Sequence, residues 1–218
     1  MQAVIFDMDG TLVNSEPVHK KIERDFFNEC GIEISEEDHQ AYVGMTMPAF
    51  YGELKEKFGL SGKVEDFIAS HKKLYLEYLM QGRNVQLMPG VVDLIQGFSA
   101  RGMKLALATS ALREVMEGVM RSFDLGQYFS IKLCSDDVVN GKPDPEIFLR
   151  ASEGLEVPSP GCLVFEDAVN GVRAAKSAGM KCIGYTFFGK NPQDLSDADM
   201  MIDDYKRITV DDFGSLWS

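Results

Sequence analysis

The stretch AVIFDMDGTL (residues 3–12) turns from apolar to acidic at its midpoint. Its apolar first part is too short for a helix and predicts a buried strand that ends at Asp7. Successive side chains of a strand point to opposite faces, so Asp7 and Asp9 share one face and Met8 takes the other. Gly10 permits a tight turn directly after the pair. The stretch therefore predicts a buried strand that ends in two neighbouring carboxylates.

Short apolar runs of the same kind recur along the chain, bounded by turn or charged residues. The predicted strands are 3–6, 104–108, 131–134, 162–165, 182–185 and 200–202. Helical patterns with start and stop signals lie between them, at 90–99, 112–123, 145–153 and 168–178. Strands and helices that alternate in this way form right-handed βαβ units. We predict an α/β fold with a Rossmann-like parallel sheet as its core.

One long segment interrupts the alternation. Between residues 16 and 82 the apolar residues recur at helical spacing and no strand pattern is found. This segment is predicted to be an all-helical cap domain, inserted after the first strand. The core domain is then formed by residues 1–15 together with 83–218.

Composition and charge narrow the class of partner. The net charge of −12 argues against nucleic acid or an anionic membrane as the main partner, but not against a small anionic substrate. No apolar run is long enough to span a bilayer, and the N-terminus shows no signal peptide. The four widely spaced cysteines suit a reducing compartment. We expect a cytoplasmic, monomeric protein whose main partner is neither nucleic acid nor a membrane.

The ends of the predicted strands carry the polar residues of interest. Ligands of open parallel sheets bind at the carboxyl ends of the strands. The residues that follow successive strands are Asp7, Asp9, Thr109, Ser110, Lys142, Glu166 and Asp167. Four carboxylates at one sheet edge repel one another, and a divalent cation removes that cost. Oxygen ligands without histidine or cysteine favour Mg²⁺ as the cofactor.

These residues lie in four motifs that resemble those of the haloacid dehalogenase superfamily of phosphotransferases. The motifs are FDMDGTL (6–12), ATS (108–110), GKPDP (141–145) and VFEDAVNG (164–171). The helical insert looks like the cap of the subgroup that holds beta-phosphoglucomutase and the sugar-phosphate phosphatases. The resemblance implies a Mg²⁺-dependent phosphatase of small phosphorylated sugars or related metabolites that works through an aspartyl-phosphate intermediate.

The resemblance also implies a role for each motif residue. Asp7 is the expected nucleophile, and Asp9 the acid and base that serves the leaving alcohol and the attacking water. Thr109 and Lys142 are expected to stabilise charge on the transferring phosphoryl group. The expected metal-binding residues are Asp7, Asp9 (through its backbone carbonyl), Glu166 and Asp167.

Substrate-binding residues are harder to assign. Ser110 is the last residue of the second motif and is expected to contact the substrate. His19 lies at the entry to the cap, where the mutase of the resembling subgroup has a histidine that contacts substrate. Lys73, or its neighbour Lys72, could supply a cation from the cap.

Several functions remain open at this stage. The mutase pattern has an arginine in the cap that grips a second phosphate, and here Met47 of GMTMP (44–48) stands in its place. Met cannot bind phosphate bidentately, which favours hydrolysis over beta-phosphoglucomutase activity. A phosphatase for phosphoglycolate or a nucleotide is a further alternative. Two alternatives are not enzymes: a receiver-type signalling module, and a member of the superfamily that only binds its ligand.

Overall fold

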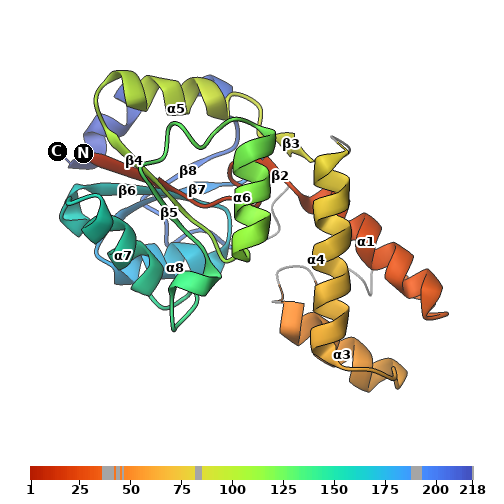
Figure 1. The fold of residues 1–218 in the computed structure, drawn as a ribbon. Helices are drawn as coiled ribbons and strands as arrows, with labels where there is room; N and C mark the ends of the chain where they lie inside the picture. Colours follow the sequence, from red (N-terminus) through yellow and green to blue (C-terminus); the bar gives the residue numbers. More distant parts are fainter. Residues whose placement is uncertain (36–41, 43–44, 46, 82–84, 188–192, 218) are drawn as a thin grey trace. The chain divides into compact units, whose positions relative to one another are not determined.

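The computed structural model describes residues 1–35, 42, 45, 47–81, 85–187 and 193–217. It divides the chain into two compact units (Figure 1). One unit consists of Met1–Asn14 and Gln86–Ser218, and the other of Ser15–Val85. We call them the α/β unit and the helical unit.

A six-stranded sheet forms the centre of the α/β unit. Its strands are β1 (Ala3–Phe6), β4 (Lys104–Ala108), β5 (Ile131–Leu133), β6 (Cys162–Glu166), β7 (Lys181–Tyr185) and β8 (Met200–Ile202). Their order is β5-β4-β1-β6-β7-β8, and all neighbours pair in parallel. The parallel sheet confirms the predicted α/β fold. Strand β1 lies in the middle, so the residues that follow it lie between the ends of β4 and β6.

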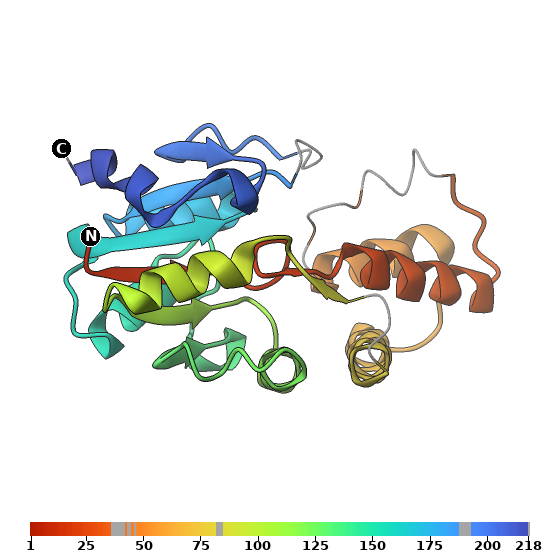
Figure 2. The ribbon, with the colours of Figure 1, turned by 90° about the horizontal axis from the view of Figure 1, so that it is seen from above.

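Helices cover both faces of this sheet, as Figures 1 and 2 show. The α-helices are α5 (Val91–Ala100), α6 (Arg113–Ser122), α7 (Glu146–Gly154) and α8 (Val169–Ser177). Short 3₁₀ turns are η1 (Ser135–Asp137), η2 (Ser159–Gly161), η3 (Tyr205–Arg207) and η4 (Val210–Trp217). Helix α5 lies on one face and α7 and α8 on the other. A strand covered on both sides is buried along its whole length. Every residue of β1 is fully buried, which explains why all four residues are apolar.

A two-stranded ribbon stands beside the main sheet. Strand β2 (Val13–Asn14) pairs antiparallel with β3 (Gln86–Leu87), and the amide of Met88 donates to the carbonyl of Leu12 at 2.8 Å. The chain passes from one unit to the other after Asn14 and returns after Val85, and this ribbon pairs the residues next to these two points. A strand of only two residues is too short to show a hydrophobic periodicity, so the sequence patterns did not predict this ribbon.

The helical unit is built from α1 (Glu16–Glu29), α3 (Met47–Phe58) and α4 (Val64–Met80). Pro17 lies in the first turn of α1, where its missing amide proton costs nothing. Gly31 and Gly59 follow α1 and α3 in the left-handed conformation that favours glycine. The core of this unit is largely aromatic and consists of Phe27, Ile32, Tyr42, Phe50, Tyr51 and Leu54.

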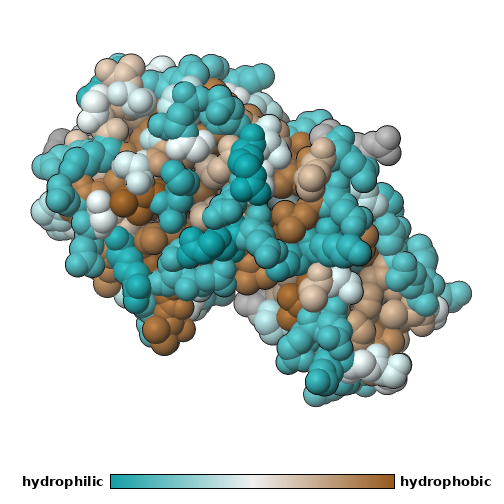
Figure 3. Space-filling model, in the orientation of Figure 1, coloured by the Kyte–Doolittle hydropathy of each residue, from teal (hydrophilic) through white to brown (hydrophobic). Residues whose placement is uncertain are grey.

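The exposed residues are mostly polar on the face that Figure 3 shows. On the face shown in Figure 3, hydrophilic residues dominate each unit and hydrophobic ones form smaller areas between them. Among the described helices, none has both the length and the apolar character needed to cross a membrane.

Acidification is expected to destabilise the helical unit, because His71 is buried there. Burial, together with nearby His19, lowers the pKa of His71 from 6.5 to about 3. The unfolded chain therefore binds more protons between these values. Stability is complete above about pH 6.5 and falls toward pH 3, by at most about 1.4 kcal/mol per pH unit for one group.

Urea unfolding of wild type and His71→Gln at several pH values tests this expectation. The variant lacks the titrating ring, so its stability should depend less on pH across this range. Equal pH slopes in the two proteins would show that His71 is not the source.

Candidate active site

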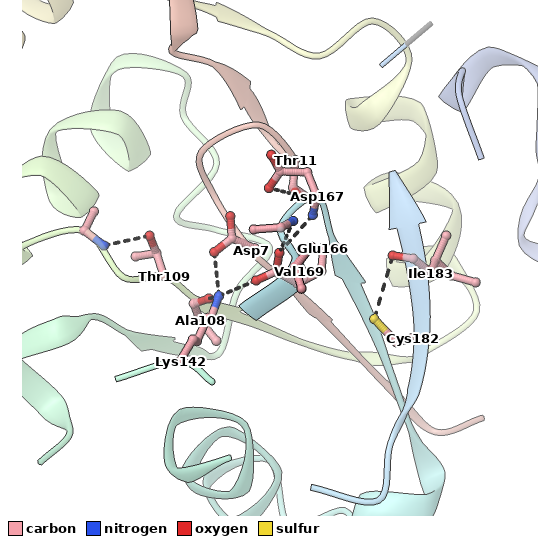
Figure 4. A network of polar contacts seen from close by, with 12 residues as sticks. Asp7, Thr11, Ala108, Thr109, Lys142, Glu166, Asp167, Val169, Cys182 and Ile183 are labelled. Carbon is pink, nitrogen blue, oxygen red and sulfur yellow. Dashed lines mark hydrogen bonds and ion pairs between the residues drawn. The ribbon is translucent and has the colours of Figure 1, made fainter. Parts of the chain in front are cut away.

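Lys142 connects the carboxylates at the centre of the sheet edge (Figure 4). Its Nζ lies 2.7 Å from Asp7 Oδ1 and 2.7 Å from Glu166 Oε1, and it donates to the carbonyl of Ala108 at 3.0 Å. The ring of Phe148 lies under the ammonium, with its centroid 4.9 Å away. The Lys142 side chain is only 6% exposed. Burial by itself lowers the pKa of Lys142, but the two ion pairs outweigh it and raise the pKa above its usual value, so the side chain carries a fixed positive charge.

Glu166, at the end of β6, is held from several sides. Its Oε2 accepts hydrogen bonds from the amides of Asp167 and Ala168, both at 2.9 Å. Its Oε1 binds Lys142. A Cβ atom placed on Gly171 of α8 would come within 1.7 Å of Glu166 Oε1, so only glycine leaves room for the carboxylate. Glu166 is therefore fixed in place by the start of α8 and by Lys142.

Replacing Gly171 by alanine is expected to displace Glu166 and to weaken divalent-cation binding by about 10-fold. The added methyl group collides with a carboxylate that cannot move without losing its hydrogen bonds. Titration calorimetry with Mg²⁺ measures the affinity, and thermal unfolding reports the stability.

Gly52→Ala in α3 is the matched control, because a Cβ atom there meets nothing within 4 Å. We expect this substitution to leave cation affinity unchanged and not to lower stability. An unchanged affinity in Gly171→Ala would mean that Glu166 does not support a metal site.

The turn after β1 lies against Asp167. Gly10 has a φ of +80°, and a Cβ atom there would lie 2.0 Å from Asp167 Oδ2. The Thr11 hydroxyl donates to Asp167 Oδ1 at 3.4 Å. Asp9 Oδ1 is buried and has no hydrogen-bond partner among the described residues. A buried carboxylate oxygen without a partner is costly, which suggests a group that awaits a proton donor or a ligand.

Thr109 and Ser110 follow β4 and differ in exposure. Thr109 is buried, and its Oγ1 accepts a hydrogen bond from the amide of Ala111 at 3.0 Å. This bond leaves the hydroxyl proton of Thr109 for another acceptor. Ser110 is exposed. Of the two, Thr109 has the fixed orientation.

The charges at this edge fit a divalent cation. Oxygen atoms of Asp7, Glu166 and Asp167 lie within 4.8 Å of one another. Lys142 offsets one of these three charges, so two remain uncompensated. Burial, with the neighbouring carboxylates, raises the pKa of Asp7 to about 8 and that of Asp167 well above its usual value. An all-oxygen cluster with this excess of negative charge suits Mg²⁺.

For the residues expected to bind substrate from the helical unit, the contacts that the structure describes lie within that unit. His19 is hydrogen-bonded within the helical unit, to His71. Lys73 is exposed on α4 and lies 3.9 Å from Glu77 Oε1. Met47 is the first residue of α3, whereas Gly44 and Thr46 of the same stretch lie outside the described residues.

Two contacts of Lys142 were not predicted from the sequence. The carbonyl of Ala108 carries no side-chain signal, and Phe148 reads as a core residue of α7. An aromatic residue that follows a motif lysine by six positions could at most have suggested the stacking.

The chain is similar to known proteins in both sequence and fold. The profile of a family described as haloacid dehalogenase-like hydrolase matches residues 4–185. A phosphorylated carbohydrates phosphatase of Thermotoga maritima is 37% identical over 84% of this chain and 84% of its own length. Protein CbbY of Rhodobacter capsulatus is 32% identical over 94% and 93%. The structure of CbbY from Rhodobacter sphaeroides in complex with phosphate has a TM-score of 0.80 and 26% identity, over 94% and 95% of the two chains.

Proposed function

The chain belongs to the haloacid dehalogenase-like hydrolases, and from this premise we propose that it is a Mg²⁺-dependent phosphatase of small phosphorylated sugars or related metabolites. The bond it cleaves is that of a phosphoric monoester. The relative that acts on phosphorylated carbohydrates supports the substrate class. The observation that carries the proposal is the pair of 2.7 Å contacts by which Lys142 holds Asp7 and Glu166. Near them lies Asp9, whose buried Oδ1 has no hydrogen-bond partner in the described part of the chain.

Asp7 is the proposed nucleophile. One oxygen of its carboxylate is bound by Lys142, which leaves the other to attack phosphorus. The attack expels the alcohol and forms an aspartyl-phosphate, which water then hydrolyses. Lys142 is charged and fixed, so it compensates negative charge on the transferring group without rearranging. The proton of the Thr109 hydroxyl is a second donor for the phosphoryl oxygens.

Asp9 is the proposed acid and base. In the first step it gives its proton to the leaving oxygen, and in the second it accepts a proton from the attacking water. Its buried Oδ1, unpaired among the described residues, suits a group whose partner is the reacting molecule.

The proposed cation site uses Asp7, Asp167 and the backbone carbonyl of Asp9. Glu166 orients the residues around this site, since its own oxygens bind Lys142 and the amides of Asp167 and Ala168. The bound ion neutralises charge between the nucleophile and the phosphate. Asp7 and Asp167 would hold the ion, and Gly10 lets the turn after β1 approach Asp167 closely.

We propose that residues 16–82 serve as a cap over the core formed by 1–15 and 83–218, and that the protein acts as a monomer. Closure of such a cap excludes water and opening releases product. X-ray scattering with and without a phosphate mimic tests this. Identical profiles in the two conditions would contradict closure.

Hydrolysis is favoured over isomerisation by Met47. A mutase must grip a second phosphate and keep water from the aspartyl-phosphate, and a thioether cannot form bidentate hydrogen bonds with phosphate. Met47 is half-buried at the start of α3.

The test is phosphate release over a panel of sugar phosphates, with and without Mg²⁺, including beta-glucose 1-phosphate. Formation of glucose 6-phosphate is followed in parallel, with a trace of the bisphosphate as primer. We expect Mg²⁺-dependent release from several sugars without isomerisation. Isomerisation faster than release would identify a mutase instead, and no phosphate release from any member would refute the phosphatase.

A further inference from the structure

The helical unit contains a chain of hydrogen bonds that the proposed reaction does not use. The Tyr51 hydroxyl of α3 lies 2.7 Å from His71 Nδ1 of α4, and His71 Nε2 lies 2.9 Å from His19 Nδ1 of α1. Tyr51 is 1% exposed and His71 is 2% exposed. The ring of His19 is half-buried and stacks on Tyr75, with ring centroids 4.9 Å apart. The chain thus leads from an aromatic core to a partly exposed imidazole.

The direction of this chain follows from the buried groups. Burial lowers the pKa of His71 and raises that of Tyr51, so both are neutral. A neutral imidazole has one donor nitrogen and one acceptor nitrogen. Among the described residues, the phenol proton of Tyr51 has one acceptor, His71 Nδ1. Tyr51 therefore donates to His71 Nδ1, and His71 donates from Nε2.

The direction of the chain determines the tautomer of His19. Its Nδ1 accepts the hydrogen bond from His71, so the neutral ring carries its proton on Nε2. The opposite direction would leave the buried phenol proton without an acceptor in the described part of the chain, which is unfavourable. The contact with His71 and the stacking on Tyr75 also fix the plane of the ring.

We propose that Tyr51 and His71 are positioning residues that hold His19 with Nε2–H as a hydrogen-bond donor for an oxygen of the substrate. The inference rests on the proposed function, since the acceptor is a hydroxyl or ester oxygen of a phosphorylated sugar. Tyr51 and His71 act through His19 and do not touch the substrate. They order the ring before binding, which reduces the entropic cost of the contact.

Nitrogen NMR of the histidine rings tests the positioning without any activity. The chain has only three histidines, so their signals can be assigned by substitution. At about pH 8 we expect His19 to carry its ring proton on Nε2 in wild type. Tyr51→Phe should convert His19 and His71 to mixtures of tautomers. A wild-type His19 protonated on Nδ1, or no change in Tyr51→Phe, would overturn the proposal.

Tyr42→Phe is the matched control, because it removes a buried phenol oxygen from the same unit. The Tyr42 hydroxyl accepts from Lys57 at 3.4 Å and contacts neither histidine in the described hydrogen bonds. We expect wild-type tautomers in this variant. The same shift in both variants would mean that the rings respond to loosened packing, which would contradict the chain.

Kinetics on a sugar phosphate test the use of the donor. Tyr51→Phe should raise KM by about 3- to 10-fold and keep kcat within about 2-fold. His19→Ala should raise KM at least as much, and Tyr51→Phe should add nothing in the His19→Ala background. Additive effects, or an unchanged KM in His19→Ala, would overturn the proposal. These outcomes can be distinguished from failure of the proposed function, because in that case the wild-type protein itself would release no phosphate.

Discussion

Asp7→Asn is expected to lower phosphatase turnover by at least about 10³-fold while the protein remains folded. The amide has the same shape as the carboxylate but cannot attack phosphorus. Lys142 keeps its second partner, Glu166 Oε1 at 2.7 Å. One of the crowded carboxylates is also removed, so the midpoint of thermal unfolding without Mg²⁺ should stay equal or rise.

Asp144→Asn is the matched control for this variant. Asp144 lies in the same sheet-edge motif as Lys142, but its Oδ1 accepts the amide of Glu146 at the start of α7. An amide oxygen accepts equally well there, so turnover should remain near that of wild type. Phosphate release assays and thermal unfolding measure both variants. Near-normal turnover of Asp7→Asn would end the assignment of the nucleophile.

Asp9→Asn is expected to lower turnover of a sugar phosphate by at least about 10²-fold. The reason is loss of a proton donor for the leaving alcohol and of an acceptor for the attacking water. The amide can occupy the same space, and the backbone carbonyl of Asp9 is unchanged. Affinity for Mg²⁺, measured by calorimetry, should therefore stay close to that of wild type.

p-Nitrophenyl phosphate separates the acid role from general damage to the site. Nitrophenolate leaves with little help from an acid, so the first release of nitrophenol by Asp9→Asn should stay within about 10-fold of wild type. A burst of nitrophenol followed by slow turnover is expected, because hydrolysis of the aspartyl-phosphate then lacks the base that accepts a proton from water. Equal loss of the first step on both substrates would contradict the acid role.

The sheet and its edge could be predicted because most of its strands are short, largely apolar runs that are bounded by turn or charged residues. Strand β4 has the predicted bounds, and β6 runs one residue beyond the predicted end, to Glu166. Asp7 and Asp9 were recognisable since a paired charge after a buried run has few structural explanations. The ribbon of β2 and β3 could not be predicted, because its pairing joins segments that lie far apart in the sequence.

The supporting contacts were also beyond the sequence. The backbone carbonyl of Ala108 and the close approach of Gly171 to Glu166 depend on tertiary geometry alone. In the helical unit, His19 and His71 lie on separate helices, and their spacing in the chain gives no sign that the rings meet. Substrate choice depends on contacts of this kind, which is why the sequence supports a substrate class and not a single sugar.

The most direct test of the central claim is to trap the phosphoryl group on Asp7. Enzyme, Mg²⁺ and a substrate that wild type hydrolyses are mixed, quenched in acid within one turnover and reduced with borohydride, which converts an aspartyl-phosphate to homoserine. The tryptic peptide of residues 1–20 carries both Asp7 and Asp9, so fragmentation distinguishes the two positions. The account predicts homoserine at position 7 and unmodified Asp9. Homoserine at another position, or at none while substrate is consumed, would contradict it.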